Sequence, residues 1–179
     1  MARLKLLFLY LFSKIHAELQ PGEMKIVFLQ TGKTAEKYIS DGIAIFSERI
    51  TRLTGFEIIT VPDLRNTRSM PPAEQMIREG RLQLQHTGKD DLVVLLDRRG
   101  KRLDTIAFAN ELGRMMMTSK KRIIFLAGGP WGVSEEVFSR ADFVLSLSDM
   151  TFSHQMVRLL FMEQLYRVVT ILKGIPYHH

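Results

Sequence analysis

The stretch SLSDMTFSHQMVRLLFMEQLYR, residues 146–167, decides the fold and indicates where a ligand binds. An apolar strand end, residues 143–147, runs into a loop rich in hydroxyl groups. The helix predicted after the loop is apolar on nearly every side, and such a helix must be buried all round. In a small chain this indicates burial against its own core and against a partner. The stretch is therefore a candidate ligand site beside a dimer interface.

The composition sets the class of protein. The 179 residues, 46% of them hydrophobic, are enough for one compact domain. The chain has no cysteine, which excludes disulfides, thiolate nucleophiles and thiolate zinc sites and fits a cytoplasmic protein. The net charge of +6 favours polyanionic partners such as nucleic acid.

Residues 1–23 differ from the rest of the chain. Arg3 and Lys5 precede an apolar run at residues 6–12, as at the front of a signal peptide. The run is too short to span a bilayer, and no clean small-x-small cleavage site follows it. Met24 then opens a typical first strand, MKIVFLQ. We expect residues 1–23 to be an upstream-start artefact or a loose extension and residues 24–179 to form a single domain; a membrane anchor is the alternative.

From Met24 onward, predicted strands alternate with predicted helices. Strands are expected at residues 25–30, 56–61, 91–96, 122–126 and 143–147, and helices at residues 35–53, 73–85, 105–117, 134–140 and 154–172. Continuous apolar strands between helices predict an α/β domain whose mostly parallel sheet carries helices on both faces.

Ligands of such sheets bind beyond the carboxyl ends of the strands. Three expected loops lie there: DRRGKRLD (residues 97–104), AGGPWGVS (residues 127–134) and SDMTFS (residues 148–153). The glycines allow backbone amides to approach a ligand closely, although a simple tight turn is the alternative. Ser134, followed by two glutamates, is a good helix start.

Other nucleotide and metal sites are excluded by spacing. GGPWG is not G-x-G-x-x-G and lies late in the chain. TGKT, residues 31–34, resembles the end of a P-loop, but Val27 occupies the required earlier glycine position. His154 stands alone and His178 adjoins His179, so no metal-ligand spacing is present.

Five further segments occur in order at separations that match a known family. They are LDRRGK (96–101), FLAGGPWG (125–132), SLSDMT (146–151), HQMVRLLFMEQLYR (154–167) and PYHH (176–179). Residues 24–179 thus resemble the RlmH family, small methyltransferases that modify a pseudouridine at N3 in large-subunit (23S) ribosomal RNA. The resemblance implies a SPOUT fold with a carboxyl-terminal trefoil knot and a homodimer. Topology rules alone would not suggest a knot.

The resemblance also implies that the three loops bind S-adenosylmethionine. The implied contacts are Leu96, Gly129, Ser148, Asp149, Met150, Thr151, Phe152 and Ser153. Many relatives carry proline where this chain has Ser153, so its loop is expected to be less rigid. At Gly129 only glycine allows close backbone approach, and valine is expected to fill cofactor space.

The methyl transfer needs alignment and a group that accepts a proton or stabilises an anion. His154 and Arg158 are four residues apart and share a helix face beside the cofactor loop. Arg158 suits the developing imide charge and His154 a base; the alternatives are an interface salt bridge and a structural histidine. In the tail, Tyr177 and His178 are expected to close the partner's site, with Tyr177 stacking on a base, unless the terminus is idle.

Two other functions stay open at this point. Basic residues favour a non-catalytic RNA-binding or ribosome-associated module; they are Arg98, Arg99, Lys101, Arg102, Lys120, Lys121 and Arg122. Residues 1–23 favour a membrane-tethered interaction protein. For the methyltransferase, the expected substrate is the assembled ribosome rather than naked RNA, the expected location is the cytoplasm, and no membrane or metal partner is expected.

Overall fold

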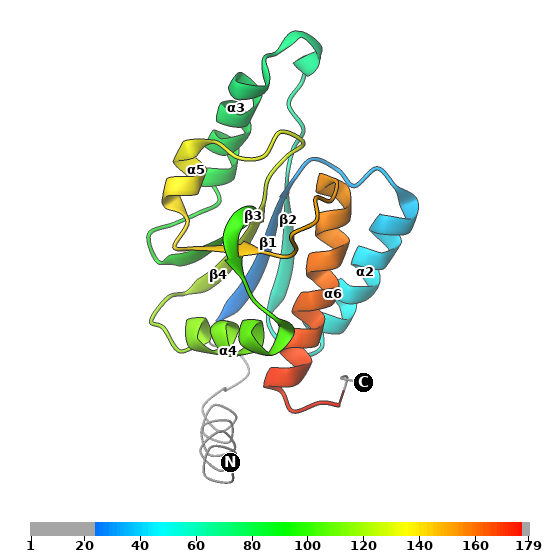
Figure 1. Cartoon of the computed structure of the whole chain (residues 1–179), viewed down its shortest axis with the longest axis vertical. Helices are drawn as coiled ribbons and strands as arrows, with labels where there is room; N and C mark the ends of the chain where they lie inside the picture. Colours follow the sequence, from blue (N-terminus) through cyan, green and yellow to red (C-terminus); the bar gives the residue numbers. More distant parts are fainter. Residues whose placement is uncertain (1–23, 177–179) are drawn as a thin grey trace.

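The computed structural model describes residues 24–176 (Figure 1). The strands are β1 (Lys25–Thr31), β2 (Phe56–Val61), β3 (Asp91–Arg102), β4 (Arg122–Ala127) and β5 (Phe143–Ser146). The helices are α2 (Lys37–Thr51), α3 (Pro72–Leu84), α4 (Thr105–Met116), α5 (Glu135–Arg140) and α6 (His154–Leu172), with a short 3-10 turn at Thr67–Ser69. The expectations for residues 1–23, Tyr177 and His178 lie outside the described residues.

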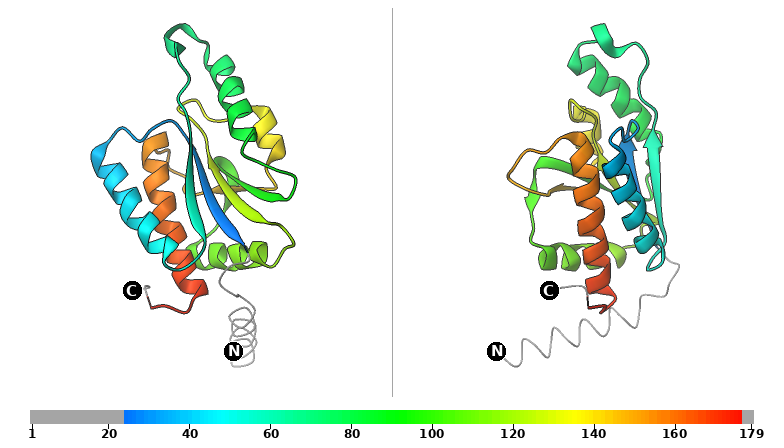
Figure 2. Two further views of the ribbon diagram at one scale, coloured as in Figure 1. Left: turned by 180° about the vertical axis from the view of Figure 1, so that it is seen from behind. Right: turned by 90° about the vertical axis from the view of Figure 1, so that its right-hand side faces the viewer.

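The strands form one sheet in the order β2-β1-β4-β3-β5, and every pairing is parallel. Helices α2, α4 and α6 pack on one face, and α3 and α5 pack on the other (Figures 1 and 2). The predicted α/β class, parallel sheet and two covered faces are therefore confirmed. Because all strands are parallel, their carboxyl ends meet at one edge of the sheet, where ligands of such folds bind.

The apolar strands are continuous because both faces of the sheet are covered. In β1, Ile26 and Phe28 belong to the core under α2, α4 and α6, while Val27 and Leu29 face α3 and α5. All four side chains are fully buried. Alternate residues of a strand point to opposite faces, so a run without polar gaps is what this position requires.

Strand β3 is longer than expected. The sequence predicted a loop from residue 97, but the strand continues to Arg102. The extension pairs with β5 in a second register, Lys101 with Leu145 and Arg102 with Ser146, after an irregularity that follows Leu96. Gly100 permits this pairing, since a Cβ there would lie 2.6 Å from the Val144 carbonyl group. The prediction was wrong because the charges of DRRGKR are typical of a loop and the pairing with β5 is a long-range contact.

Helix α6 is buried mainly within its own chain. It lies beside α2, as Figures 1 and 2 show, and also packs against α4 and the sheet. The Phe161 ring lies 4.8 Å, between centroids, from both Phe28 and Phe125. Five apolar residues of the helix are buried in this core: Phe161, Met162, Leu165, Val168 and Val169. Leu159 is half-buried.

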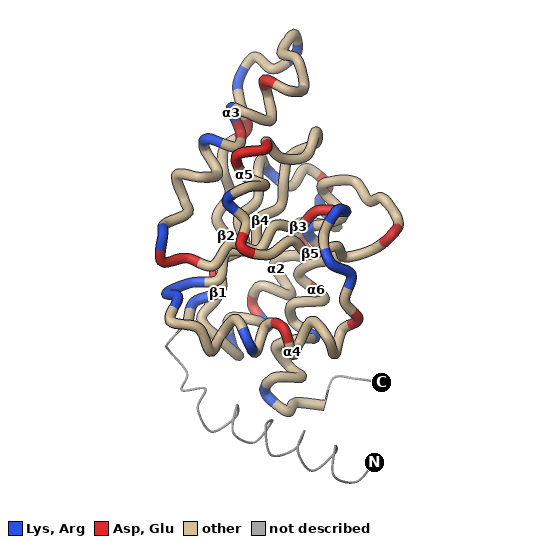
Figure 3. The backbone as a smooth tube through the Cα atoms, turned by 60° about the vertical axis from the view of Figure 1, so that its left-hand side comes forward, with Lys and Arg blue, Asp and Glu red and all other residues tan. Residues whose placement is uncertain are grey.

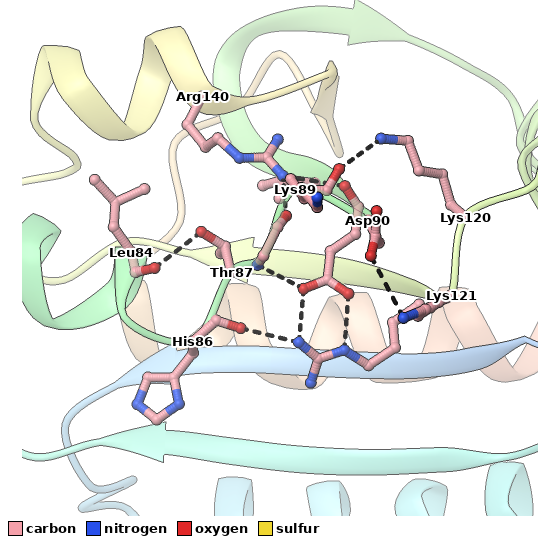
Figure 4. A network of polar contacts seen from close by, with 12 residues as sticks. Leu84, His86, Thr87, Lys89, Asp90, Lys120, Lys121 and Arg140 are labelled. Atoms are coloured by element: carbon pink, nitrogen blue, oxygen red, sulfur yellow. Dashed lines mark hydrogen bonds and ion pairs between the residues drawn. The ribbon is translucent and has the colours of Figure 1, made fainter.

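An ion pair joins the amino-terminal ends of β3 and β4, opposite the end of the sheet where ligands bind. At the starts of β3 and β4, Arg122 donates to both carboxylate oxygens of Asp91, at 2.8 and 2.6 Å. Figure 4 shows the surrounding contacts, in which Lys120 donates to the Lys89 carbonyl and Lys121 pairs with Asp90. The three consecutive basic residues Lys120, Lys121 and Arg122 are therefore all engaged in structural contacts.

Replacing Asp91 with asparagine is expected to lower the free energy of unfolding at pH 7 by about 1–3 kcal/mol, because a charge-assisted bond is lost. The hydrogen bond from Arg122 holds the pKa of Asp91 below its ordinary value of 3.8. The stabilisation is thus complete above that value and is lost as pH falls through the lower folded pKa. Urea unfolding should show the difference between wild type and variant narrowing below about pH 4.

The matched control is Asp41→Asn, which removes an exposed ion pair with Lys37 on one helix. Its expected cost is below about 1 kcal/mol. Equal losses for the two variants would contradict the role given to Asp91.

Candidate active site

A pocket of about 570 Å³ lies at the carboxyl ends of β3, β4 and β5. Its walls come from residues 96–99 of β3, residues 127–133, residues 145–148 and 150–152, and the first turns of α6, so the three loops predicted to bind a ligand meet there. The predicted contacts that line it are Leu96, Gly129, Ser148, Met150, Thr151 and Phe152, and predicted His154 lines it too.

Two predicted contacts are not brought to the pocket. Asp149 is exposed and pairs with Arg102, with 2.7 Å between Oδ1 and Nε. Ser153 is the N-cap of α6, where its hydroxyl accepts the Met156 N–H at 3.2 Å. A serine cap stabilises the helix start through the side chain, which is a different role from that of a ligand contact.

Hydroxyl groups fold the loop between β5 and α6. The Ser146 hydroxyl donates to the Ser148 carbonyl at 3.1 Å, and the Ser148 hydroxyl accepts the Met150 N–H at 2.9 Å. This turn leaves the Met150 side chain 74% exposed at the pocket. Serines in this stretch thus shape the loop through local side-chain bonds.

A side chain of helix α3 limits the space at Gly129. A Cβ at Gly129 would lie 2.2 Å from Oε2 of Glu79, so a side chain there would meet this carboxylate first. A valine at this position would therefore also have to move the Glu79 carboxylate, in addition to entering the space expected for the cofactor. Glu79 is buried, burial raises its pKa, and its Oε2 has no hydrogen-bond partner among the described residues.

Helix α3 also supplies pocket residues that the sequence did not reveal. Met76 lines the pocket, and Gln75 accepts a hydrogen bond at 3.2 Å from the indole N–H of Trp131, another lining residue. Nothing in the sequence signalled Met76, because α3 precedes the glycine loop by some fifty positions. Trp131 had a signal: it is the one tryptophan of the chain and lies inside the glycine loop.

His154 lines the pocket at the first residue of α6. Burial lowers the pKa of its imidazole below 6.5, and the nearby Arg158 charge lowers it further. The ring is therefore neutral at neutral pH, which a proton acceptor requires. Its Nε2 lies 3.2 Å from Nε2 of Gln155, whose amide also donates to the Lys33 carbonyl.

Arg158 shares the helix face but does not line the pocket. It is 1% exposed and donates to the Gly32 carbonyl at 3.0 Å, the Thr34 hydroxyl at 2.9 Å and the Thr31 carbonyl. Within residues 24–176 it has no carboxylate within 4.0 Å. The guanidinium therefore holds the connection after β1 against α6.

Between residues 24 and 176, no three histidine, aspartate or glutamate side chains gather as metal ligands would. None of the helices in that range combines the length and apolar character of a membrane span.

Comparison with known proteins gives a match over the described domain. A family model described as "Predicted SPOUT methyltransferase" matches residues 24–178. The Ribosomal RNA large subunit methyltransferase H of Christiangramia forsetii is 47% identical over 156 residues, which cover 87% of this chain and 99% of that protein. The protein of the same name from Bacteroides thetaiotaomicron is 43% identical over the same shares. Among solved structures, a probable methyltransferase from Bordetella pertussis Tohama I has a TM-score of 0.47 at 9% identity, covering 89% of this chain and 99% of the other.

Proposed function

The chain belongs to the SPOUT methyltransferase family, and on this premise we propose that it transfers a methyl group from S-adenosylmethionine to N3 of a pseudouridine in 23S ribosomal RNA. The substrate is the large subunit within the assembled ribosome, which places the activity in the cytoplasm. The observation that carries the proposal is the pocket at the ends of β3, β4 and β5, where the cofactor loops meet.

The pocket fits the cofactor. Its volume of about 570 Å³ lies within the range of small-molecule sites. Leu96, Leu145 and Met150 offer apolar walls, and the backbone of residues 128–132 offers polar groups for adenine and ribose. When bound, S-adenosylmethionine supplies a methyl group that its sulfonium already activates.

The residues of this chain then have a limited task, which is to align the imide nitrogen and remove its proton. Neutral His154, in the pocket wall, is the proton acceptor. To accept a proton at Nε2, His154 gives up its contact with the Gln155 amide. That amide still donates to the Lys33 carbonyl. Arg158 acts as a positioning residue, because it fixes the first turns of α6 against the end of β1.

We further propose that the protein is a homodimer whose carboxyl-terminal part forms a trefoil knot. The insertion of β4 between β1 and β3, and the double pairing of β5 with β3, support the knot. Apolar side chains left exposed support the dimer: Met150, Phe152, Tyr38 and Ile45. The interface should bury well over ~1,000 Å². Sedimentation velocity at micromolar concentration is expected to show a dimer, and a stable monomer would refute this.

Calorimetry with S-adenosylmethionine separates this enzyme from a passive RNA-binding module, the other function that the sequence favoured. We expect one binding event per subunit for the wild type. Gly129→Val should weaken it strongly, because the added side chain enters the pocket wall and its Cβ lies 2.2 Å from the Glu79 carboxylate. Gly55→Val is the matched control, since a Cβ there makes contacts no closer than 3.9 Å, away from the pocket. A wild type without affinity, or a folded Gly129→Val protein with full affinity, would contradict the proposal.

A further inference from the structure

The single tryptophan of the chain stands exposed at the cofactor pocket. The Trp131 side chain lines the pocket and is nevertheless 56% exposed. Leu96, Leu145 and Val157 are among the aliphatic residues that line the pocket. A large aromatic ring at such a rim offers a flat surface to a ligand that comes from solvent rather than to one enclosed by the pocket.

A chain of hydrogen bonds fixes the orientation of this ring. The indole N–H donates to Oε1 of Gln75 at 3.2 Å, and Nε2 of Gln75 donates to Oε1 of Glu79 at 2.8 Å. Glu79 is 3% exposed and lies directly beneath Gly129. The chain therefore links a buried carboxyl group below the cofactor loop to an aromatic ring at its rim.

Two arginines lie in the segment that leads into Gln75. Gln75 lies in the first turn of α3, directly after residues 62–71, which project from the body as an arm (Figures 1 and 2). Arg65 and Arg68 of this arm are exposed and have no ion-pair partner among the described residues. Figure 3 shows both basic and acidic positions at this projecting end. Unpaired arginines in the segment that leads into α3, together with the exposed ring that Gln75 of α3 orients, fit an RNA strand, with phosphates on the arginines and a base on the ring.

We propose that Trp131 is the platform on which an unpaired nucleobase of the ribosomal RNA stacks, while Arg65 and Arg68 bind the adjoining phosphates. The inference rests on the proposed function and adds to it the element that receives the RNA. Trp131 touches the substrate, and Gln75 positions it. Stacking on an aromatic ring is how proteins hold bases that have left a helix.

The test is the kinetics of methyl transfer to unmodified ribosomes. Trp131→Ala is expected to lower kcat/KM by about ten- to a hundredfold through a higher KM for ribosomes, given the usual strength of base–aromatic stacking. The affinity for S-adenosylhomocysteine, measured by calorimetry, should change by less than about twofold if the ring faces RNA. Trp131→Phe keeps a ring but loses the bond to Gln75, so a severalfold loss is expected.

The positioning role of Gln75 is tested by a double-mutant cycle. Gln75→Met and Trp131→Phe remove the two ends of one hydrogen bond, so the double variant should lose no more activity than either single variant. Gln75→Met also removes the bond to buried Glu79, so some loss of melting temperature is expected there, whereas Trp131→Phe keeps that bond and should melt like the wild type. Lower activity of Trp131→Phe at an unchanged melting temperature is what a merely structural role would not give. Met117→Ala is the control, because this exposed side chain lies outside the pocket and should leave the kinetics unchanged.

The outcomes are distinct. If the wild type methylates ribosomes and Trp131→Ala is equally efficient, the stacking inference is overturned while the proposed function stands. If Trp131→Ala loses cofactor affinity in parallel with activity, the ring belongs to the cofactor site and the inference is also overturned. If the wild type itself transfers no methyl group, the proposed function fails first, and that is measured without any variant.

Discussion

Replacement of Arg158 with methionine is expected to lower the free energy of unfolding by about 3–5 kcal/mol. The guanidinium is buried and donates to two main-chain carbonyls, those of Thr31 and Gly32, as well as to the Thr34 hydroxyl. Methionine fills a similar volume but leaves both carbonyls without this donor. Urea unfolding followed by circular dichroism measures the loss.

Two further variants calibrate that result. Arg52→Met removes an exposed ion pair with Glu48 on one helix, so it should cost less than about 1 kcal/mol. Arg158→Lys keeps the charge but cannot reach three acceptors in the same geometry, so an intermediate loss is expected. An Arg158→Met protein that is fully stable yet inactive would instead show that the guanidinium acts on the substrate.

Mixing two inactive variants is expected to restore methyl transfer. The nineteen residues of α6 separate the cofactor loop from the tail and span roughly 28 Å. The few residues after the helix can return only about half that distance at full extension. We therefore propose that Tyr177 and His178 complete the site of the partner subunit rather than that of their own chain.

The experiment combines Gly129→Val with a truncation that lacks residues 177–179. Each homodimer should be inactive on ribosomes. After subunit exchange at equal amounts, about a quarter of the sites should have an intact loop and an intact opposing tail. Exchange between two preparations of the same truncated protein is the control and should stay inactive. If the mixed sample is also inactive after exchange, each site lies within one chain.

The sequence predicted the elements whose signals are local. Strand β2 and helix α6 have the predicted bounds. A continuous apolar run marks the strand, and a long, largely apolar segment marks the helix. The extension of β3 was not predictable in this way, because its pairing with β5 depends on contacts far apart in the chain and its own residues are charged.

The site shows the same division. The three loops were expected together because parallel strands bring their carboxyl ends to one edge. The spacing of His154 and Arg158 predicted that they share a helix face. It did not predict how deeply each side chain is buried. His154 lines the pocket, whereas Arg158 is buried beside it. The contribution of α3 through Gln75, Met76 and Glu79 arises from packing across the sheet edge, which no local pattern encodes.

Transfer of a methyl group to ribosomal RNA is tested most directly by mass-spectrometric mapping of 23S ribosomal RNA from cells with and without this protein. We predict one pseudouridine that carries a methyl group at N3 when the protein is present, lacks it when the gene is removed, and regains it when the purified protein and S-adenosylmethionine are added to the unmodified ribosomes. Identical maps from the two sources, with the protein expressed and folded, would contradict the account.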